Sequence, residues 1–512
     1  MKLVKGKNVY TYVLLSLAFI IVNLATLSTL APWIDEVMML DTSYNMAFHG
    51  RWETTAWYRV VGAYPFSTYP PLYQMTAAVW MWLFGGNMVV VRSLNLLIAF
   101  MLGGICLRLM ERHGVKLTLW TTGLFSVLFW GTSEMAWMYR NGRPDMLGAL
   151  FVSLTALAID HYLQTRSLSA RMTVIASSAL LFCSGIQAAV YLCTLWLFCL
   201  IVMKSRRKAV VTLLPLLLAG FMLGLLLVSL FMLLWWRLEA FICSIVQYSA
   251  TLSDMALAVL PWVGEWSGFD VSPYTQKLSE LTTDRSFTAR LASITEYRSF
   301  LILSAITLTA YAASSRHHLR RLFCNEGFLF LLCALSVPFL MNLAGRFAPY
   351  YRWMAYLPLL FAVVSMAGRS RLWCALYGLV AVSMSVFGIQ SMLADGDWNY
   401  GQIRSFVWRQ HFRPSDAVVC PFALFYEIKP VCDTCYFVGI FPTEYISRVD
   451  YIIETPDGDE RLRVGERSSG IFDKPITDYV NKLKADTTIT LTAIDHQAHP
   501  SLTLYQVSKK HE

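Results

Sequence analysis

Long apolar runs, each about the length of a membrane span, recur along this chain of 512 residues. The first, residues 9–30, contains no charged side chain and follows Lys2, Lys5 and Lys7. As an α-helix it would extend about 33 Å, enough to cross a bilayer core of about 30 Å. It is too long for the apolar core of a cleaved signal peptide. We therefore expect a retained first helix with its N-terminus inside the cell.

Further apolar runs predict more helices after the first. They lie near residues 71–86, 88–110, 117–133, 144–163, 172–186, 187–203, 210–236, 299–315, 326–345, 350–368 and 372–394. The span 172–203 is free of charge over 32 positions, too long for one crossing and short for two. Ser184-Gly185 in its middle therefore predicts a tight hairpin of two short helices.

Basic residues set the orientation, because loops rich in Lys and Arg stay in the cytoplasm. The clusters are Arg108/Arg112/Lys116, Arg166/Arg171, Lys204 to Lys208, Arg316 to Arg321 and Arg369/Arg371. All of them can lie inside only if residues 71–86, which follow Pro70-Pro71, dip into the membrane and return or lie oblique. This predicts eleven net crossings. The segments expected outside are 31–70, 134–145, 237–298, 346–352 and everything after about residue 395.

The C-terminal tail is a different kind of sequence, polar and with short β-like runs. The runs are residues 417–420, 436–440, 451–454, 488–493 and 501–507. We therefore divide the chain into a transmembrane domain, 1–394, and a small α/β domain, 395–512. The predicted fold is a polytopic α-helical membrane protein of about 11–13 transmembrane helices with a small periplasmic α/β domain.

Composition agrees with this division. Apolar residues make up 56% of the chain and charged residues 15%, with a mean hydropathy of +0.50. Soluble domains carry roughly 25% charge, so these values exclude a disordered chain, a coiled coil and an ordinary soluble enzyme. The net charge of +9 is better explained by cytoplasmic loops than by nucleic-acid binding.

The chain has eleven cysteines, most of them in apolar runs where cysteine acts as a small buried hydrophobe. Cys432 and Cys435 instead lie in the tail. A redox motif is one interpretation of this CxxC spacing, but no thioredoxin-like context surrounds it. We favour a structural disulfide that involves Cys420 or joins the two, and the spacing leaves the pairing open.

The first outer loop, residues 31–70, carries Asp35 and Glu36 directly after the first helix. Two adjacent carboxylates at a membrane surface are costly unless they are solvated or used. Asp35 could cap a helix that starts at Glu36, or it could act in catalysis. His49 lies in the same loop, where a single histidine is more often structural than a metal ligand.

Two further charged groups face the same predicted side. Arg143 and Asp145 flank Pro144, a favoured first residue of a helix. Arg346 and Arg352 lie among aromatic residues at another helix entrance. Arginine matches phosphate oxygens in a fork geometry, although each group could equally be a helix cap or an interfacial anchor. Their convergence on one side suits a lipid-phosphate substrate.

Short motifs in the first 200 residues follow a fixed order. They are Asp35-Glu36, Gly50-Arg51-Trp52, Pro70-Pro71-Leu72-Tyr73, Phe84-Gly85, Arg92-Ser93-Leu94 and Arg143-Pro144-Asp145. This order resembles the GT-C glycosyltransferases of the dolichyl-phosphate-mannose protein mannosyltransferase type, including bacterial aminoarabinose transferases. The latter tend to carry Glu-Lys before Pro-Pro, where this chain has Thr68-Tyr69, so lipid A modification is not implied. The repeat domain of eukaryotic protein mannosyltransferases is also missing.

The resemblance implies an inverting glycosyltransferase at the periplasmic face of a bacterial inner membrane. It would move a sugar from a polyprenyl-phosphate carrier to an acceptor hydroxyl on a protein, lipid or glycan. Asp35 would be the base, with Glu36 as its alternate or orienting partner. The expected substrate or phosphate ligands are Arg143, Asp145, Arg346, Arg352, Tyr69 and His49. A divalent metal cofactor cannot be decided from the sequence, and no nucleic acid is expected.

Two other classes of protein remain open. A transporter or flippase of a lipid-linked glycan would place its functional charges near mid-bilayer, whereas the charges here cluster at one interface. A non-catalytic scaffold would tolerate replacement of Asp35 and Arg143. The sequence does not name the sugar or the acceptor.

Overall fold

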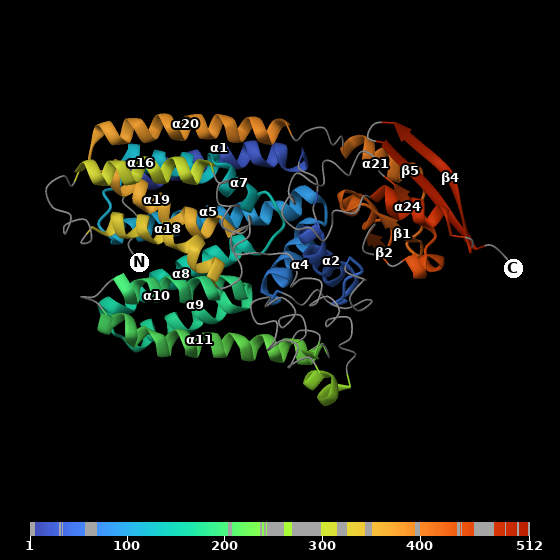
Figure 1. Ribbon diagram of the computed structural model, residues 1–512, viewed down its shortest axis with the longest axis horizontal. Helices are drawn as coiled ribbons and strands as arrows, with labels where there is room; N and C mark the ends of the chain where they lie inside the picture. The colour runs from blue at the N-terminus through green and yellow to red at the C-terminus, as the bar shows by residue number, and fades with distance from the viewer. Residues whose placement is uncertain are drawn as a thin grey trace.

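The computed structural model of the chain has two parts, a helical bundle and a domain built on a β-sheet (Figure 1). The structure describes residues 6–29, 32, 34–56, 69–202, 207–235, 238–239, 242, 261–268, 298–314, 325–343, 351–394, 400–437, 441, 443–454, 476–486, 488–498 and 501–509. The sheet domain lies at one end of the bundle, beyond the last bundle helix (Figure 1).

A helix occupies each apolar run predicted from the sequence. The bundle helices are α1 (Gly6–Thr26), α5 (Met88–Arg112), α6 (Leu119–Gly131), α8 (Asp145–Thr165), α9 (Leu168–Ser184), α10 (Ile186–Val202), α11 (Arg207–Leu234), α16 (Arg298–Ser314), α18 (Glu326–Leu343), α19 (Trp353–Ala367) and α20 (Arg371–Ala394). Among the described residues, five helices are long and apolar enough to span a membrane and six shorter ones are apolar. The polytopic helical fold is therefore confirmed, while the number of crossings stays a prediction.

Local sequence signals explain several helix ends. Asn87 caps α5 by accepting a hydrogen bond from the backbone of Val90 at 3.0 Å, and Ser167 caps α9 in the same way. Gly185 alone separates α9 from α10. The predicted hairpin at this glycine is therefore confirmed.

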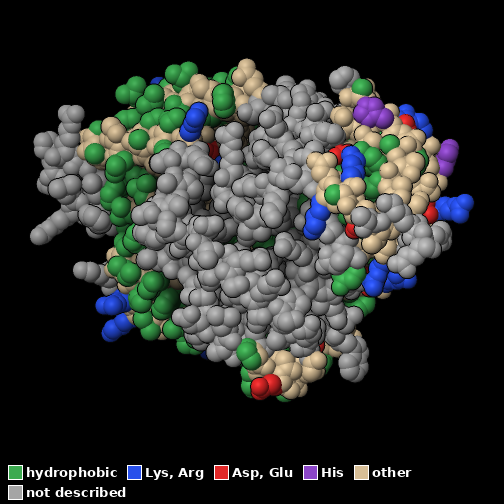
Figure 2. All heavy atoms as spheres, turned by 45° about the vertical axis from the view of Figure 1, so that its right-hand side comes forward, with side chains coloured by type: hydrophobic (Ala, Val, Ile, Leu, Met, Phe, Trp, Pro, Cys, Tyr) green, Lys and Arg blue, Asp and Glu red, His purple; other side chains and the backbone are tan. Residues whose placement is uncertain are grey.

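Exposed leucines along α11 suit a helix that faces lipid; they are Leu218, Leu223, Leu225, Leu226, Leu227, Leu230, Leu233 and Leu234. The described surface of the bundle is largely hydrophobic, whereas Lys, Arg and His side chains gather over the sheet domain (Figure 2). This division of the surface, together with the long apolar helices, makes the chain a membrane protein.

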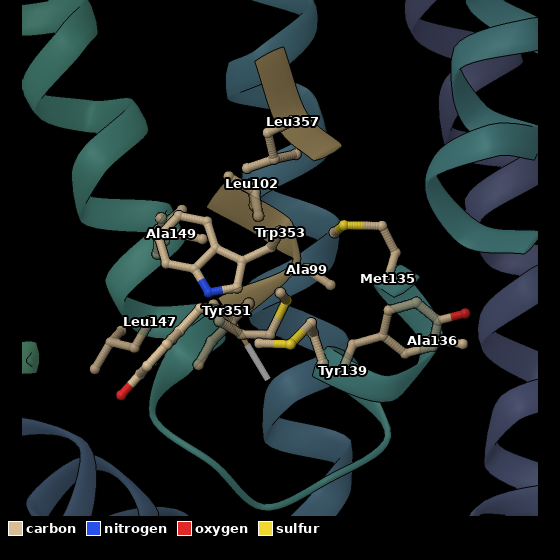
Figure 3. Close-up of a cluster of buried hydrophobic side chains, with 14 of the residues drawn as sticks. Ala99, Leu102, Met135, Ala136, Tyr139, Leu147, Ala149, Tyr351, Trp353 and Leu357 are labelled. Carbon is tan, nitrogen blue, oxygen red and sulfur yellow. The ribbon is translucent and has the colours of Figure 1, made fainter. Parts of the chain in front are cut away.

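The bundle interior is packed with aromatic and small side chains (Figure 3). Trp353 of α19 lies at its centre, buried beside Leu102 of α5 and Ala149 of α8. Its ring meets that of Tyr191 edge-on, with centroids 5.3 Å apart. Such contacts join four helices that are distant in sequence into one core.

Short elements close the bundle at the end that faces the sheet domain (Figure 1). They are η1 (Leu27–Thr29), α2 (Ile34–His49), α4 (Leu72–Phe84) and α7 (Ser133–Tyr139). α4 packs against α2 and α5. Its position beside α2 suits a segment that does not cross the membrane. α2 begins at Ile34, so Asp35 lies inside its first turn and does not take the capping position, one of the two roles that the sequence left open for it.

In the described part of the sheet domain, five strands form a sheet in the order β2-β1-β3-β5-β4. They are β1 (Ala417–Cys420), β2 (Thr434–Phe437), β3 (Tyr451–Glu454), β4 (Ile489–Ala498) and β5 (Ser501–Lys509). β1 pairs in parallel with β2 and β3, while β5 runs antiparallel to β3 and β4. β2 starts two residues earlier than predicted; residues 438–440, the end of the expected run, lie outside the described residues. Helices α21 (Tyr400–Arg409), α22 (Phe425–Ile428) and α24 (Ile476–Lys484) complete the domain.

Three cysteines are buried in this domain. Cys420 of β1 and Cys435 of β2 face each other, with their sulfur atoms 3.5 Å apart. The structure contains no disulfide between these two or to Cys432, so the predicted disulfide stays a prediction. Burial raises the pKa of the Cys435 thiol well above its usual range, which makes it a poor nucleophile in the folded protein. The structure thus places Cys435 against Cys420, one of the partners that the sequence left open.

Candidate active site

Asp35 and Arg143, 108 residues apart in sequence, form an ion pair at the end of the bundle that faces the sheet domain. The Arg143 guanidinium donates Nη1–H to Asp35. Its Nε–H donates to Asp145 at 2.7 Å, and Nη2–H donates to the hydroxyl of Tyr69 at 3.3 Å. Four residues predicted as site residues are therefore brought together by one guanidinium.

The loop that carries Arg143 is held close to α2. Asn95 of α5 donates its side-chain amide to the carbonyls of Asn141 and of Arg143, the latter at 2.9 Å. A Cβ at Gly142 would collide with Leu40 and lie 3.2 Å from the Glu36 carboxylate. Any larger residue at this position would displace Leu40 of α2, because the loop approaches the helix so closely. Arg143 is then directed at the start of α2.

Glu36 takes a different partner from its neighbour Asp35. Arg92 of α5 donates Nε–H and Nη2–H to the two Glu36 oxygens, each at 2.7 Å. Its Nη1–H donates to the carbonyl of Leu27 at 2.6 Å. Tyr426 of α22 adds a third donor to Glu36, from its hydroxyl at 2.9 Å. The carboxylate of Glu36 is thus fully engaged, as a charge removed from water must be.

Exposure separates the two carboxylates. The side chains of Glu36 and Arg92 are 0% exposed, and those of Arg143 and Asp145 are 1% and 4% exposed. The Asp35 side chain is 26% exposed. Of these five charged groups, Asp35 is the one most accessible to a substrate.

Aromatic residues border the group on one side. The hydroxyl of Tyr69 lies 3.4 Å from that of Tyr351, and Tyr351 is followed by Arg352 and by α19. This places Arg352 next to a residue that contacts the site, while its role as a phosphate ligand stays a prediction. Arg346, the other predicted phosphate ligand, lies outside the described residues.

His49, in contrast, does not join this group. It is the last residue of α2, so it lies about 20 Å along the helix from Asp35. Its Nε2 is 3.8 Å from an oxygen of Asp433 in the sheet domain. The structure places it in a contact between the two parts of the chain.

The side chains of the site do not form a metal-binding cluster. Within the described residues, no group of three or more His, Cys, Asp and Glu side chains is arranged to hold a metal ion. Asp35 and Asp145, the carboxylates at the centre of the site, both bind Arg143. The Arg143 guanidinium lies between these two carboxylates, so in this arrangement Asp35 and Asp145 hold an arginine and not a metal ion.

Sequence reasoning missed three contacts around α2. Arg92 belongs to the Arg92-Ser93-Leu94 motif, but it also places a charge inside an apolar run, which is a signal of function or of a buried partner. Tyr426 and Lys429 carried no such signal, because their partners lie far away in the sequence. Tyr426 binds Glu36, which is 390 residues away, and Lys429 binds Asp41 in the same helix.

Comparisons with known proteins rest on structure alone. No family model and no curated protein matches the chain. An apo oligosaccharyltransferase from Archaeoglobus fulgidus aligns over 90% of this chain and 71% of its own, with 12% identity and a TM-score of 0.54. The chain has the GT-C fold.

Two other solved structures are similar to it. The oligosaccharyltransferase AglB from Archaeoglobus fulgidus, in complex with an inhibitory peptide and a dolichol-phosphate, aligns over 88% of this chain and 71% of its own, with 10% identity and a TM-score of 0.50. ArnT from Cupriavidus metallidurans, bound to undecaprenyl phosphate, aligns over 96% of this chain and 97% of its own, with 12% identity. Its TM-score of 0.44 adds no weight to the fold assignment.

Proposed function

We propose that the chain is an inverting glycosyltransferase that moves a sugar from a polyprenyl-phosphate carrier to an acceptor hydroxyl. The observation that carries this proposal is the partly exposed Asp35, held by the buried Arg143 at one end of a bundle with the GT-C fold. A carboxylate fixed at a membrane surface and open to substrate is what a general base for a lipid-linked donor requires.

Two observations support a polyprenyl-phosphate donor. The AglB structure of similar fold is a complex with a dolichol-phosphate. In this chain, Arg352 directly follows Tyr351, whose hydroxyl lies 3.4 Å from that of Tyr69 in the site. We assign Arg352, together with Arg346, to the donor phosphate, because arginine binds phosphate oxygens through paired N–H groups.

In the proposed reaction the acceptor oxygen attacks the anomeric carbon from the face opposite the phosphate. The bond between that carbon and the phosphate oxygen breaks, and its electron pair leaves with polyprenyl phosphate. The acceptor hydroxyl proton passes to Asp35. Inversion follows because one displacement occurs, and cationic side chains stabilise the charge on the leaving phosphate.

The two adjacent carboxylates then have different roles. Asp35 is the base, because it is the accessible one. Glu36 is the orienting partner, because its oxygens accept from Arg92 and Tyr426 and its side chain is fully buried. Arg143 and Asp145 fix the direction of the Asp35 carboxylate, and Tyr69 extends this group toward Tyr351.

The proposal places the site and the sheet domain on the periplasmic face of a bacterial inner membrane. Its support is the pattern of basic clusters, which all lie on the opposite side when the N-terminus is inside.

The test uses the purified full chain in lipid nanodiscs with a polyprenyl-phosphate sugar labelled in the sugar. Cell-envelope proteins, lipids and glycans serve as separate acceptor pools. We expect label to enter one pool and polyprenyl phosphate to be released in equal amount. In proteoliposomes, label that crosses the bilayer while still attached to its carrier would instead show a flippase and contradict the proposal.

A further inference from the structure

Helix α2, which carries Asp35 and Glu36, is held along its length by residues 426–435 of the sheet domain. Tyr426 contacts its first turn, Lys429 its middle and Asp433 its last residue, His49. In Figure 1, α2 lies at the end of the bundle next to β2, the edge strand of this domain. The contacts therefore occur in the first turn, in the middle and at the last residue of the helix.

The first contact is a hydrogen bond to the residue next to the proposed base. Tyr426 donates its hydroxyl to Glu36 at 2.9 Å, and both side chains are buried. Burial and the charge of Glu36 raise the pKa of Tyr426 well above its usual range. Its hydroxyl thus stays protonated and remains a donor at any physiological pH.

The second contact is a buried ion pair. Lys429 lies 2.9 Å from an oxygen of Asp41, and both side chains are 0% exposed. Lys429 also donates to the carbonyl of Asp433 at 2.9 Å. A buried lysine needs such a partner, because an unpaired charge in this environment is strongly unfavourable. The sheet domain therefore cannot leave α2 without exposing or separating these charges.

Asp41 also binds residues 54–56, which follow α2 in the chain. Its second oxygen accepts from the hydroxyl of Thr54 and the backbone N–H of Thr55, each at 2.8 Å. The Thr55 hydroxyl in turn donates to the carbonyl of Cys435 in β2 at 2.6 Å. Residues 54–56 are thus fixed between α2 and the edge of the sheet.

From these contacts we propose that Tyr426 and Lys429 are positioning residues, through which the sheet domain fixes α2 and so places the Asp35 carboxylate. The fixing of α2 stands on the contacts alone, whereas its effect on sugar transfer rests on the proposed function. The sheet domain is then a working part of the active site and not a separate appendage.

The consequence for catalysis follows from geometry. Asp35 precedes Glu36 in the same rigid turn, so a movement of Glu36 moves Asp35 with it. A misplacement of about 1 Å can cost roughly 100-fold in rate, although every reacting group is still present. Binding of the lipid donor depends on other residues and would change little.

The experiment compares Tyr426→Phe with Tyr505→Phe in the full chain. Each change removes one tyrosine hydroxyl that donates to a glutamate. Tyr426 donates to Glu36 of α2, and Tyr505 donates to Glu454 within the sheet domain at 2.8 Å. Tyr505 lies in β5, which pairs with β3 and β4 and not with α2. It is therefore a matched control for general effects on the domain.

Two readouts separate the inference from the proposed function. The first is amide hydrogen exchange of residues 35–49, which we expect to become roughly tenfold faster in Tyr426→Phe and to stay unchanged in Tyr505→Phe. The second is sugar transfer, where we expect kcat to fall at least about tenfold in Tyr426→Phe with the donor KM within about twofold.

Unchanged exchange in Tyr426→Phe would overturn the inference, whether or not the chain transfers sugar. Faster exchange with unchanged kcat would overturn the positioning role and leave only a structural contact. If the wild-type chain transfers no sugar, the proposed function fails, and the exchange data still decide whether the sheet domain fixes α2.

Discussion

Asp35 and Glu36 are neighbours in the chain, yet their carboxylates bind different arginines from different segments. Asp35 meets Arg143 in the loop before α8, while Glu36 is held by Arg92 in α5. Successive residues of a helix point about 100° apart, so one turn can present one carboxylate outward and bury the other. We therefore expect a change of Glu36 to lower the stability of the protein and a change of Asp35 to lower its turnover.

Glu36→Gln is expected to cost stability. It leaves the buried Arg92 without its counter-charge, and breaking a buried pair in this way destabilises a protein by about 3–5 kcal/mol. Thermal unfolding in detergent measures the loss. The control is Glu111→Gln, whose partner Arg108 is partly exposed, because exposed pairs contribute only about 0–1 kcal/mol. Equal unfolding temperatures for the two variants would contradict the role of Glu36.

Arg143→Lys tests the fork geometry at the centre of the site. Three nitrogens of Arg143 reach three different side chains, which a single ammonium group cannot do. We expect transfer to fall roughly 100-fold because Asp35 loses its fixed direction. Arg51→Lys is the control, since Arg51 is 70% exposed. A fully active Arg143→Lys would show that charge alone suffices.

Much of the fold could be predicted from the sequence, because membrane helices and the interior strands of a sheet are long or short apolar runs. Long apolar runs gave every bundle helix, and Ser184-Gly185 gave the hairpin of α9 and α10. The strands at 417–420 and 451–454 matched as well. β2 was displaced because its first residues, Thr434 and Cys435, are fixed by pairing with β1 and not by local pattern.

The site was only partly predictable for the same reason. Topology placed Asp35, Arg143 and Tyr69 on one side, and the structure brings them together. His49 was predicted to belong with them, but a helix length separates it from Asp35. The contacts of Tyr426 and Lys429 depend on how the sheet domain packs against α2, and no local sequence pattern predicts this packing.

The cysteines of the sheet domain should report its compartment. In an oxidising compartment a thiol oxidase would remove two electrons and two protons from Cys420 and Cys435, whose sulfur atoms are 3.5 Å apart. We expect this pair to be disulfide-bonded and Cys432 to remain a thiol. Native alkylation cannot test this, because all three cysteines are buried.

The measurement is alkylation in detergent-denatured protein without reductant, followed by mass spectrometry. Cleavage after Glu427 separates Cys420 from the other two cysteines. A linked pair of peptides with labelled Cys432 is the expected result. A Cys432–Cys435 bond would refute the pairing, and three labelled cysteines would place the domain in a reducing compartment.

Orientation is tested by fusing alkaline phosphatase at about residue 400. The basic clusters predict that this point lies outside, so the enzyme should be active there. A fusion within the cluster Lys204 to Lys208 should be inactive and serves as the control. The reverse pattern would put the site on the cytoplasmic face and remove the basis for the proposed donor.

The most direct test of the account is Asp35→Asn, measured for turnover and thermal stability together. Asparagine keeps the shape of the side chain and an oxygen for Arg143, which also keeps Asp145 as its partner. General-base catalysis supplies roughly 10²–10⁴-fold in rate. The account predicts a variant that unfolds at nearly the wild-type temperature and transfers sugar slower by about that factor. A stable Asp35→Asn variant with wild-type turnover would contradict it.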